Sequence, residues 1–117
     1  MSFILLEGFT RHERHEATQL LADAISTAGW ILDHTQLSNK ALTLRFELEP
    51  NKASLLREAL AKLPVTLSPE STQRLEELVG KERLHPERSA PTLQGTFSLT
   101  FIHDEPDLKI VVPAVPG

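Results

Sequence analysis

The spacing of hydrophobic and polar residues changes several times along the chain, and each change predicts a new element. An apolar run at residues 3–9 is typical of a strand, and the apolar residues within 17–28 recur at helical spacing. Residues 30–37 begin with strand formers, and residues 41–48 alternate strictly between apolar and polar. These last two stretches predict a hairpin that turns at residues 38–40.

The pattern that follows completes a known order of elements. An amphipathic stripe at residues 55–63 predicts a second helix, and a short extended piece comes at residues 65–67. The order β-α-β-β-α-β over residues 3–68 predicts an α+β, ferredoxin-like two-layer sandwich, with one antiparallel sheet and its helices on a single face. This order resembles that of ACT-type regulatory domains. The resemblance implies a small-molecule-binding module and carries no individual binding residue over to this chain.

Several residues are typical of helix ends. Thr10 and Glu13 have the spacing of a capping box, so we expect Thr10 to cap the first helix. Gly29 is placed to end that helix in a left-handed conformation. Ser68 followed by Pro69 predicts the start of an additional helix, with the serine as its cap and the proline at its first position.

The 117 residues are expected to fold as one domain, residues 1–117. Beyond the ferredoxin-like unit, residues 69–79 are the extra helix, and residues 80–94 are predicted to be a mobile connector because they are polar and hold two prolines. Residues 95–117 are expected to supply a carboxy-terminal strand pair and an extended tail.

The two carboxy-terminal strands are predicted at residues 96–102 and 108–112. They are too apolar to stand in water as a free hairpin, so we expect them to extend the sheet at an edge, to lie over its open face or to pair with a second copy. Thr43, Arg45 and Glu47 would make the open face a polar surface. A homodimer is therefore the favoured arrangement.

Composition narrows the possible functions. A net charge of −4 and the absence of tyrosine argue against a nucleic-acid partner. No apolar stretch approaches the ~20 residues that span a bilayer, so no membrane partner is expected. The absence of cysteine excludes disulfides, thiolate metal ligands and a cysteine nucleophile. Since Met1 and Ser2 lead directly into a strand rather than a secretory leader, a cytoplasmic protein is expected.

His12, His15 and Glu16 form the first candidate site, on the side of the first helix that faces away from its apolar stripe. The two histidines are three residues apart, whereas the zinc-binding helix motif His-Glu-x-x-His places them four apart. A solvated, charged first turn is the simpler interpretation. A metal or anion site completed by residues from elsewhere in the chain is the alternative.

His103 and Arg45 are the other candidates. His103 is followed by three carboxylates at residues 104, 105 and 107, but their spacing does not match a calcium loop, and a turn between strands explains them equally well. Arg45 and Glu47 are expected to lie on the open face, where they either form ion pairs across strands or, in the case of Arg45, receive a small anionic ligand.

No motif for nucleophilic catalysis or phosphate binding is found, and no cofactor is predicted. The leading hypothesis is a non-enzymatic binding or regulatory module that acts as a homo-oligomer. The alternative is a metal-binding protein or small enzyme that uses His12, His15, Glu16 and His103. A third hypothesis is a structural adaptor whose sheet edge receives a strand from a partner.

Overall fold

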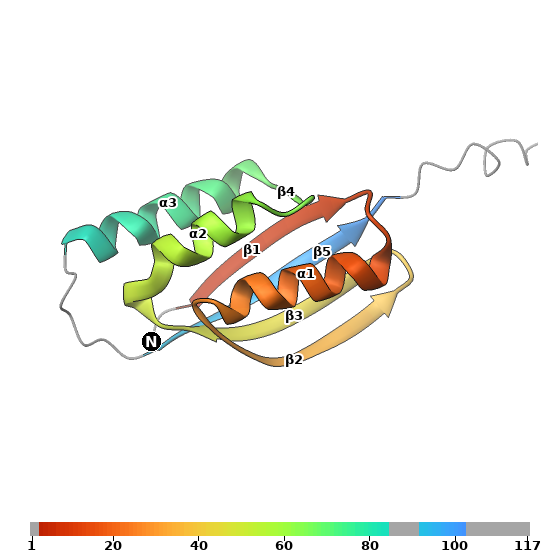
Figure 1. Cartoon of the computed structure of the whole chain (residues 1–117), viewed down its shortest axis with the longest axis horizontal. Coiled ribbons are helices and arrows are strands. Elements are labelled where there is room, and N and C mark those ends of the chain that lie inside the picture. Colours follow the sequence, from red (N-terminus) through yellow and green to blue (C-terminus); the bar gives the residue numbers. More distant parts are fainter. Residues whose placement is uncertain (1–2, 85–91, 103–117) are drawn as a thin grey trace, which may run out of the picture.

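Three helices cover one face of a five-stranded mixed sheet, so the predicted α+β class is confirmed (Figure 1). The computed structural model describes residues 3–84 and 92–102. Its elements, in chain order, are β1 (Phe3–Thr10), α1 (Arg14–Ser26), β2 (Gly29–Ser38), β3 (Ala41–Leu48), the 3-10 turn η1 (Pro50–Lys52), α2 (Ala53–Ala61), β4 (Thr66–Leu67), α3 (Pro69–Leu84) and β5 (Leu93–Phe101).

The strand order is β2-β3-β5-β1-β4, and the ferredoxin-like order is not confirmed. In a ferredoxin-like sheet the first and third strands are neighbours, whereas here β5 lies between them. β5 runs parallel to β1 and antiparallel to β3, and it pairs with each over eight residue positions. On one side of β5, β3 pairs with β2, as the predicted hairpin requires. On the other side, β1 pairs with β4.

The central position of β5 corrects the expected placement of the carboxy-terminal apolar residues. Phe97, Leu99 and Phe101 point toward the helices and are buried in the core, rather than covering the open face or a second copy. Gly95 provides room for this packing, since a Cβ atom there would lie 2.6 Å from Phe46 Cε1. The second predicted strand, 108–112, lies outside the described residues.

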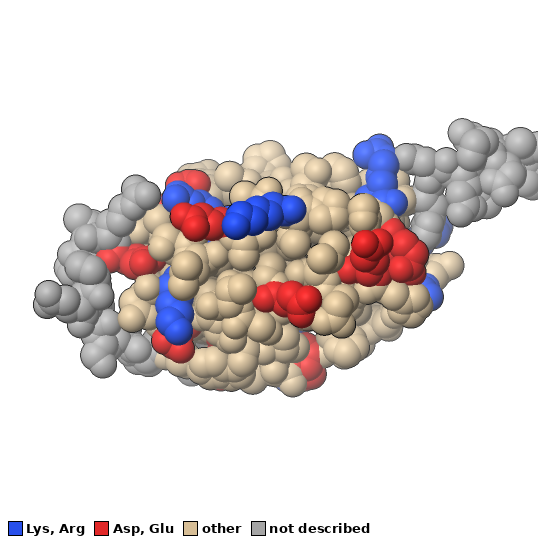
Figure 2. All heavy atoms as spheres, in the orientation of Figure 1, with Lys and Arg blue, Asp and Glu red and all other residues tan. Residues whose placement is uncertain are grey.

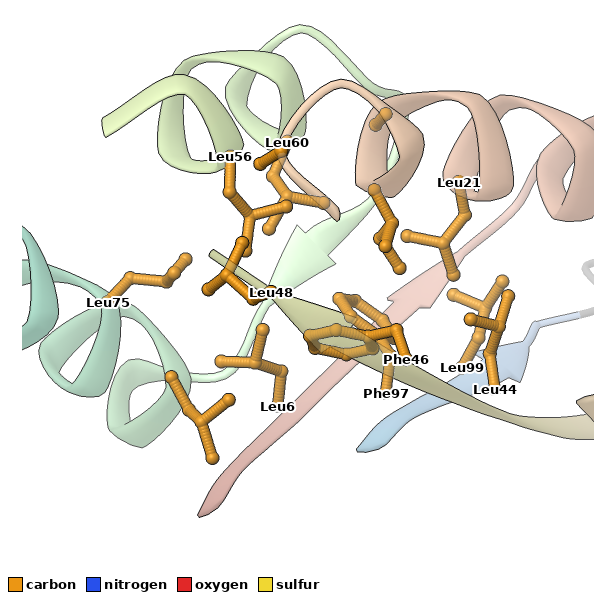
Figure 3. Close-up of a cluster of buried hydrophobic side chains, with 14 of the residues drawn as sticks. Leu6, Leu21, Leu44, Phe46, Leu48, Leu56, Leu60, Leu75, Phe97 and Leu99 are labelled. Carbon is orange, nitrogen blue, oxygen red and sulfur yellow. The ribbon is translucent and has the colours of Figure 1, made fainter. Parts of the chain in front are cut away.

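The core lies between the helices and the sheet (Figure 3). Each of the three helices contributes leucines to it, and the sheet side comes from alternate positions of β1, β3 and β5. This alternation fixes which face of each strand is buried. The labelled members are Leu6, Leu21, Leu44, Phe46, Leu48, Leu56, Leu60, Leu75, Phe97 and Leu99.

The start of α1 differs from the predicted capping box. Glu13, not Thr10, is the N-cap: its carboxylate accepts from the backbone N–H of His15 and of Glu16, at 2.9 and 3.0 Å. These two hydrogen bonds lower the pKa of Glu13. Thr10 is the buried last residue of β1, and its hydroxyl donates to the Pro64 carbonyl at 2.6 Å. The prediction failed because two residues three apart were both suitable caps.

Two glycines also differ from expectation. Gly29 does not have a positive φ; it is the first residue of β2, where a Cβ atom would collide with the Glu47 carbonyl oxygen of β3. Gly29 therefore lets β2 and β3 approach each other closely, and it does not end the helix in a left-handed conformation. Ser68 does cap α3, as predicted, since its hydroxyl accepts from Ser71 N at 3.1 Å. The helix continues through Gly80 to Leu84, beyond the expected end at Val79.

Candidate functional site

The face of the sheet opposite the helices is covered by no helix of the described residues (Figure 1). We call it the open face. The strand registers arrange its side chains in rows across β2, β3, β5 and β1. Three successive rows are Trp30–Glu47–Gln94–Phe3, Asp33–Arg45–Thr96–Leu5 and Thr35–Thr43–Ser98–Glu7.

The open face is apolar at its two margins and polar in between. Trp30 on β2 is 42% exposed, and Phe3 and Leu5 on β1 are 60% and 37% exposed. The central strands β3 and β5 present short hydroxyl and amide side chains between these margins, together with Arg45. Large apolar side chains at this level of exposure indicate a surface that can pack against another molecule.

Arg45 forms a bidentate ion pair with Asp33 on the neighbouring strand. Its Nε donates to both carboxylate oxygens, at 3.0 and 3.2 Å, and its Nη2 donates to Oδ2. The pair raises the pKa of Arg45 and lowers the pKa of Asp33. Glu47 forms no ion pair across strands among the described residues and instead accepts from Thr92 Oγ1 and Gln94 Nε2. An anion bound at Arg45 would have to compete with Asp33 for the guanidinium group.

The two edges of the sheet differ. The outer edge of β1 is covered, because β4 pairs with Gly8 and Phe9, and α3 covers the rest. The Ser71 hydroxyl accepts from Glu7 N at 2.7 Å, and Arg74 Nη1 donates to the Leu5 carbonyl at 2.8 Å. Along β2, by contrast, no strand within residues 3–84 or 92–102 pairs with the outer edge.

The candidates at the start of α1 are brought together only in part. His12 Nε2 lies 3.5 Å from Glu16 Oε1, and both side chains are exposed. The backbone N–H of His15 donates to the Glu13 cap. In the described ranges, no three His, Asp or Glu side chains are grouped so that they could hold a metal ion. His103 lies outside the described residues, so its convergence with the others stays a prediction.

Sequence reasoning did not identify an open groove of about 450 Å³ between α2, α3 and β4. Leu60, Val65 and Leu75 contribute apolar side chains to it. At its rim, Arg57 Nη1 donates to Glu76 Oε1 at 2.8 Å. The groove lies in the helical layer, away from the open face. Leu60 and Leu75 occupy ordinary core-facing positions of α2 and α3, so the hydrophobic pattern of the sequence did not indicate a groove there.

The sequence also gave no signal that separated Phe3 and Leu5 from the core. Both alternating faces of β1 are apolar, with Ile4 and Leu6 buried and Phe3 and Leu5 exposed. An alternation that is apolar on both sides does not tell which side faces solvent. The exposure of Trp30 could not be predicted either, because a single tryptophan near the start of a strand does not indicate which face of the sheet it occupies.

On the helical face, Lys and Arg side chains are interspersed with Asp and Glu and form no continuous basic patch (Figure 2). None of the helices in the described part of the chain has the length and apolarity required to cross a membrane. Comparisons of the sequence with protein-family models and with curated proteins, and of the structure with solved structures, found no match. Function is therefore inferred from the geometry alone.

Proposed function

We propose that this chain is a non-enzymatic binding module that works as a homodimer, with the open faces of two copies packed against each other. The observation that carries the proposal is the distribution of apolar residues over that face. Trp30 lies at one margin and Phe3 and Leu5 lie at the other, in rows defined by the strand registers. Packing them against a second copy would remove their exposed apolar surface from water.

The arrangement is self-complementary under a two-fold axis that runs along the strands between β3 and β5. Such an axis exchanges β2 with β1 and β3 with β5 across the interface, because these four strands are consecutive in the sheet. Trp30 of each copy then faces Phe3 of the other, since both belong to the same row. In the next row Leu5 of each copy faces Asp33 of the other, whose carboxylate is already paired with Arg45.

The same symmetry avoids contacts between like charges. Glu47 of one copy faces Gln94 of the other, and Arg45 faces Thr96. Each charged residue in these two pairs meets a neutral hydrogen-bonding side chain. This supports pairing of identical surfaces, because like charges placed directly opposite each other oppose association.

The available area suits a modest dimer. Four strands at a spacing of ~4.8 Å, with a length of about eight residues, give roughly 20 by 25 Å, or about 500 Å² per copy. Two copies would bury about 1,000 Å², which is near the lower limit for a specific interface. The helical layer, including the groove beside Arg57 and Glu76, would face outward from both copies and stay accessible to a ligand.

The mass of the protein in solution, measured by light scattering, tests the dimer. We expect wild type at high micromolar concentration to show twice the 13.0 kDa of one chain. Trp30→Glu should shift the mass to that of one chain, because it places a charge in the apolar margin. Leu55→Glu is the matched control, since Leu55 is exposed on α2, in the helical layer. A monomeric wild type, or equal masses for the two variants, would contradict the proposal.

Ligand binding and location remain predictions from the sequence. Arg45 is the candidate for a small anionic ligand, which would have to displace Asp33 from the guanidinium group and would compete with the second copy for the open face. A cytoplasmic location belongs to the same proposal.

A further inference from the structure

The groove between α2, α3 and β4 is a second surface feature of the molecule, separate from the open face. It encloses about 450 Å³, within the range of roughly 300–1,000 Å³ that small-molecule sites span. Leu60 and Leu75, one from each helix, contribute apolar side chains to it. Val65 and Leu67 also line it, and both are only partly buried. Apolar surface in the groove therefore stays in contact with solvent.

The groove is open because two of the residues along it have short side chains. Ala61, the last residue of α2, is exposed, and Thr72 lies on α3 four residues before Glu76. Residues four apart on a helix share a face, so Thr72 and Glu76 line the same side of the groove. A large side chain at position 61 would occupy the space that a ligand needs.

The charged residues of the groove carry more negative than positive charge. Arg57 Nη1 on α2 donates to Glu76 Oε1 on α3 at 2.8 Å, and this pair is neutral as a whole. Glu58 also lines the groove and forms no ion pair with any residue in the described part of the chain. Lys62, one turn further along, is not among the lining residues. The excess carboxylate complements a ligand that carries a positive charge.

The other lining residues indicate which kind of cation fits. None of the lining residues that the structure describes is aromatic, so oxygen atoms rather than a ring face would recognise the charge. A primary ammonium group has three N–H donors. The carboxylates of Glu58 and Glu76 and the hydroxyl of Thr72 are acceptors for them. Arg57 donates to Oε1 of Glu76, so Oε2 can accept from an ammonium group without breaking that ion pair.

We propose that this groove binds a primary aliphatic amine. The ammonium group lies between Glu58 and Glu76, and the hydrocarbon chain covers the apolar surface of Leu60 and Leu75. The site gives the proposed binding module a ligand of a defined chemical class. It lies in the helical layer and not on the open face, so it does not depend on the dimer.

Isothermal titration calorimetry of the full-length chain with butylamine, hexylamine and octylamine tests the proposal. We expect the affinity to rise about two- to fourfold for each added methylene, because each one buries more apolar surface. Octanoate has the same chain length and the opposite charge, and it should bind at least fivefold more weakly than octylamine. An affinity that does not depend on chain length, or octanoate binding as tight as octylamine binding, would overturn the proposal.

Substitutions in the full-length chain place the amine in the groove. Ala61→Phe should weaken octylamine binding by about tenfold or more, because the ring fills the open space. Ser26→Phe is the matched control, since Ser26 is the exposed last residue of α1, and it should leave the affinity unchanged.

Glu58→Gln should weaken octylamine binding about two- to fivefold, the size of an exposed ion pair. Glu77→Gln removes the same charge from an exposed position of α3 outside the groove and should have no effect. Equal affinities for Ala61→Phe and Ser26→Phe, or for Glu58→Gln and Glu77→Gln, would show that the amine binds elsewhere and would overturn the proposal.

Discussion

Replacing Gly95 with alanine tests the central position of β5. The added Cβ atom would lie 2.6 Å from Phe46 Cε1 and 2.9 Å from Ile4 Cγ2, both closer than normal van der Waals contact. Phe46 is fully buried and Ile4 nearly so, so neither can move without disturbing the core. Overpacking of this kind costs about 1–3 kcal/mol, while the loss of glycine flexibility in the unfolded chain returns about 0.4–1 kcal/mol. We therefore expect a net loss of about 1–2 kcal/mol.

Urea denaturation measures this loss directly. With an m-value of about 2 kcal/mol per M, the midpoint should fall by roughly 0.5–1 M. Gly80→Ala is the matched control, because no atom lies within 4 Å of its added Cβ and the site is inside α3. It should raise stability by up to ~1 kcal/mol. A Gly95→Ala midpoint equal to or above that of wild type would refute the packing of Phe46 over β5.

Two further substitutions test local features. Thr10→Val should cost about 0.5–1.5 kcal/mol in denaturation experiments, because the hydrogen bond from the buried Thr10 hydroxyl to the Pro64 carbonyl is lost, whereas Thr10→Ser should cost much less. Asp33→Asn should be less stable than wild type at neutral pH, and this difference should shrink as the pH falls below about 4. Arg45 lowers the pKa of Asp33 from 3.8, so the ion pair contributes above that value and is lost on acidification through the folded-state pKa. A difference that does not change with pH would argue against the ion pair.

Individual helices and strands could be predicted because the residue pattern that determines each one lies within the element itself. The helical spacing of α1 and α2 and the strict alternation of β3 identify both the element and its buried face. The start of α3 was found because serine followed by proline has a specific meaning at a helix start. The class of the fold follows from the order of these elements.

The position of β5 could not be predicted in the same way. Its alternation shows that one face is buried but does not identify the strands beside it. The residues that pair are far apart in the sequence, with Leu48 opposite Leu93 and Phe3 opposite Gln94. Gly95 was the one signal available. A glycine inside an apolar strand indicates close approach by another group, here the ring of Phe46.

The candidate site depended on the same long-range information. Trp30, Phe3 and Leu5 share one surface only because β5 lies between β3 and β1 and sets the width of the sheet. Arg45 lies opposite the helices and forms an ion pair across strands, as expected, but its partner Asp33 could not be named from the sequence because the register between β2 and β3 includes a shift just before it.

The most direct test of the proposed dimer is the accessibility of Trp30, which is the only tryptophan in the chain. Its fluorescence quenching by acrylamide is measured from nanomolar to high micromolar protein concentration. We predict that quenching decreases and the emission shifts to shorter wavelength as concentration rises, because Phe3 of a second copy covers the indole ring. Phe3→Glu should abolish this change. Quenching and emission that do not depend on concentration would contradict the dimer through the open face.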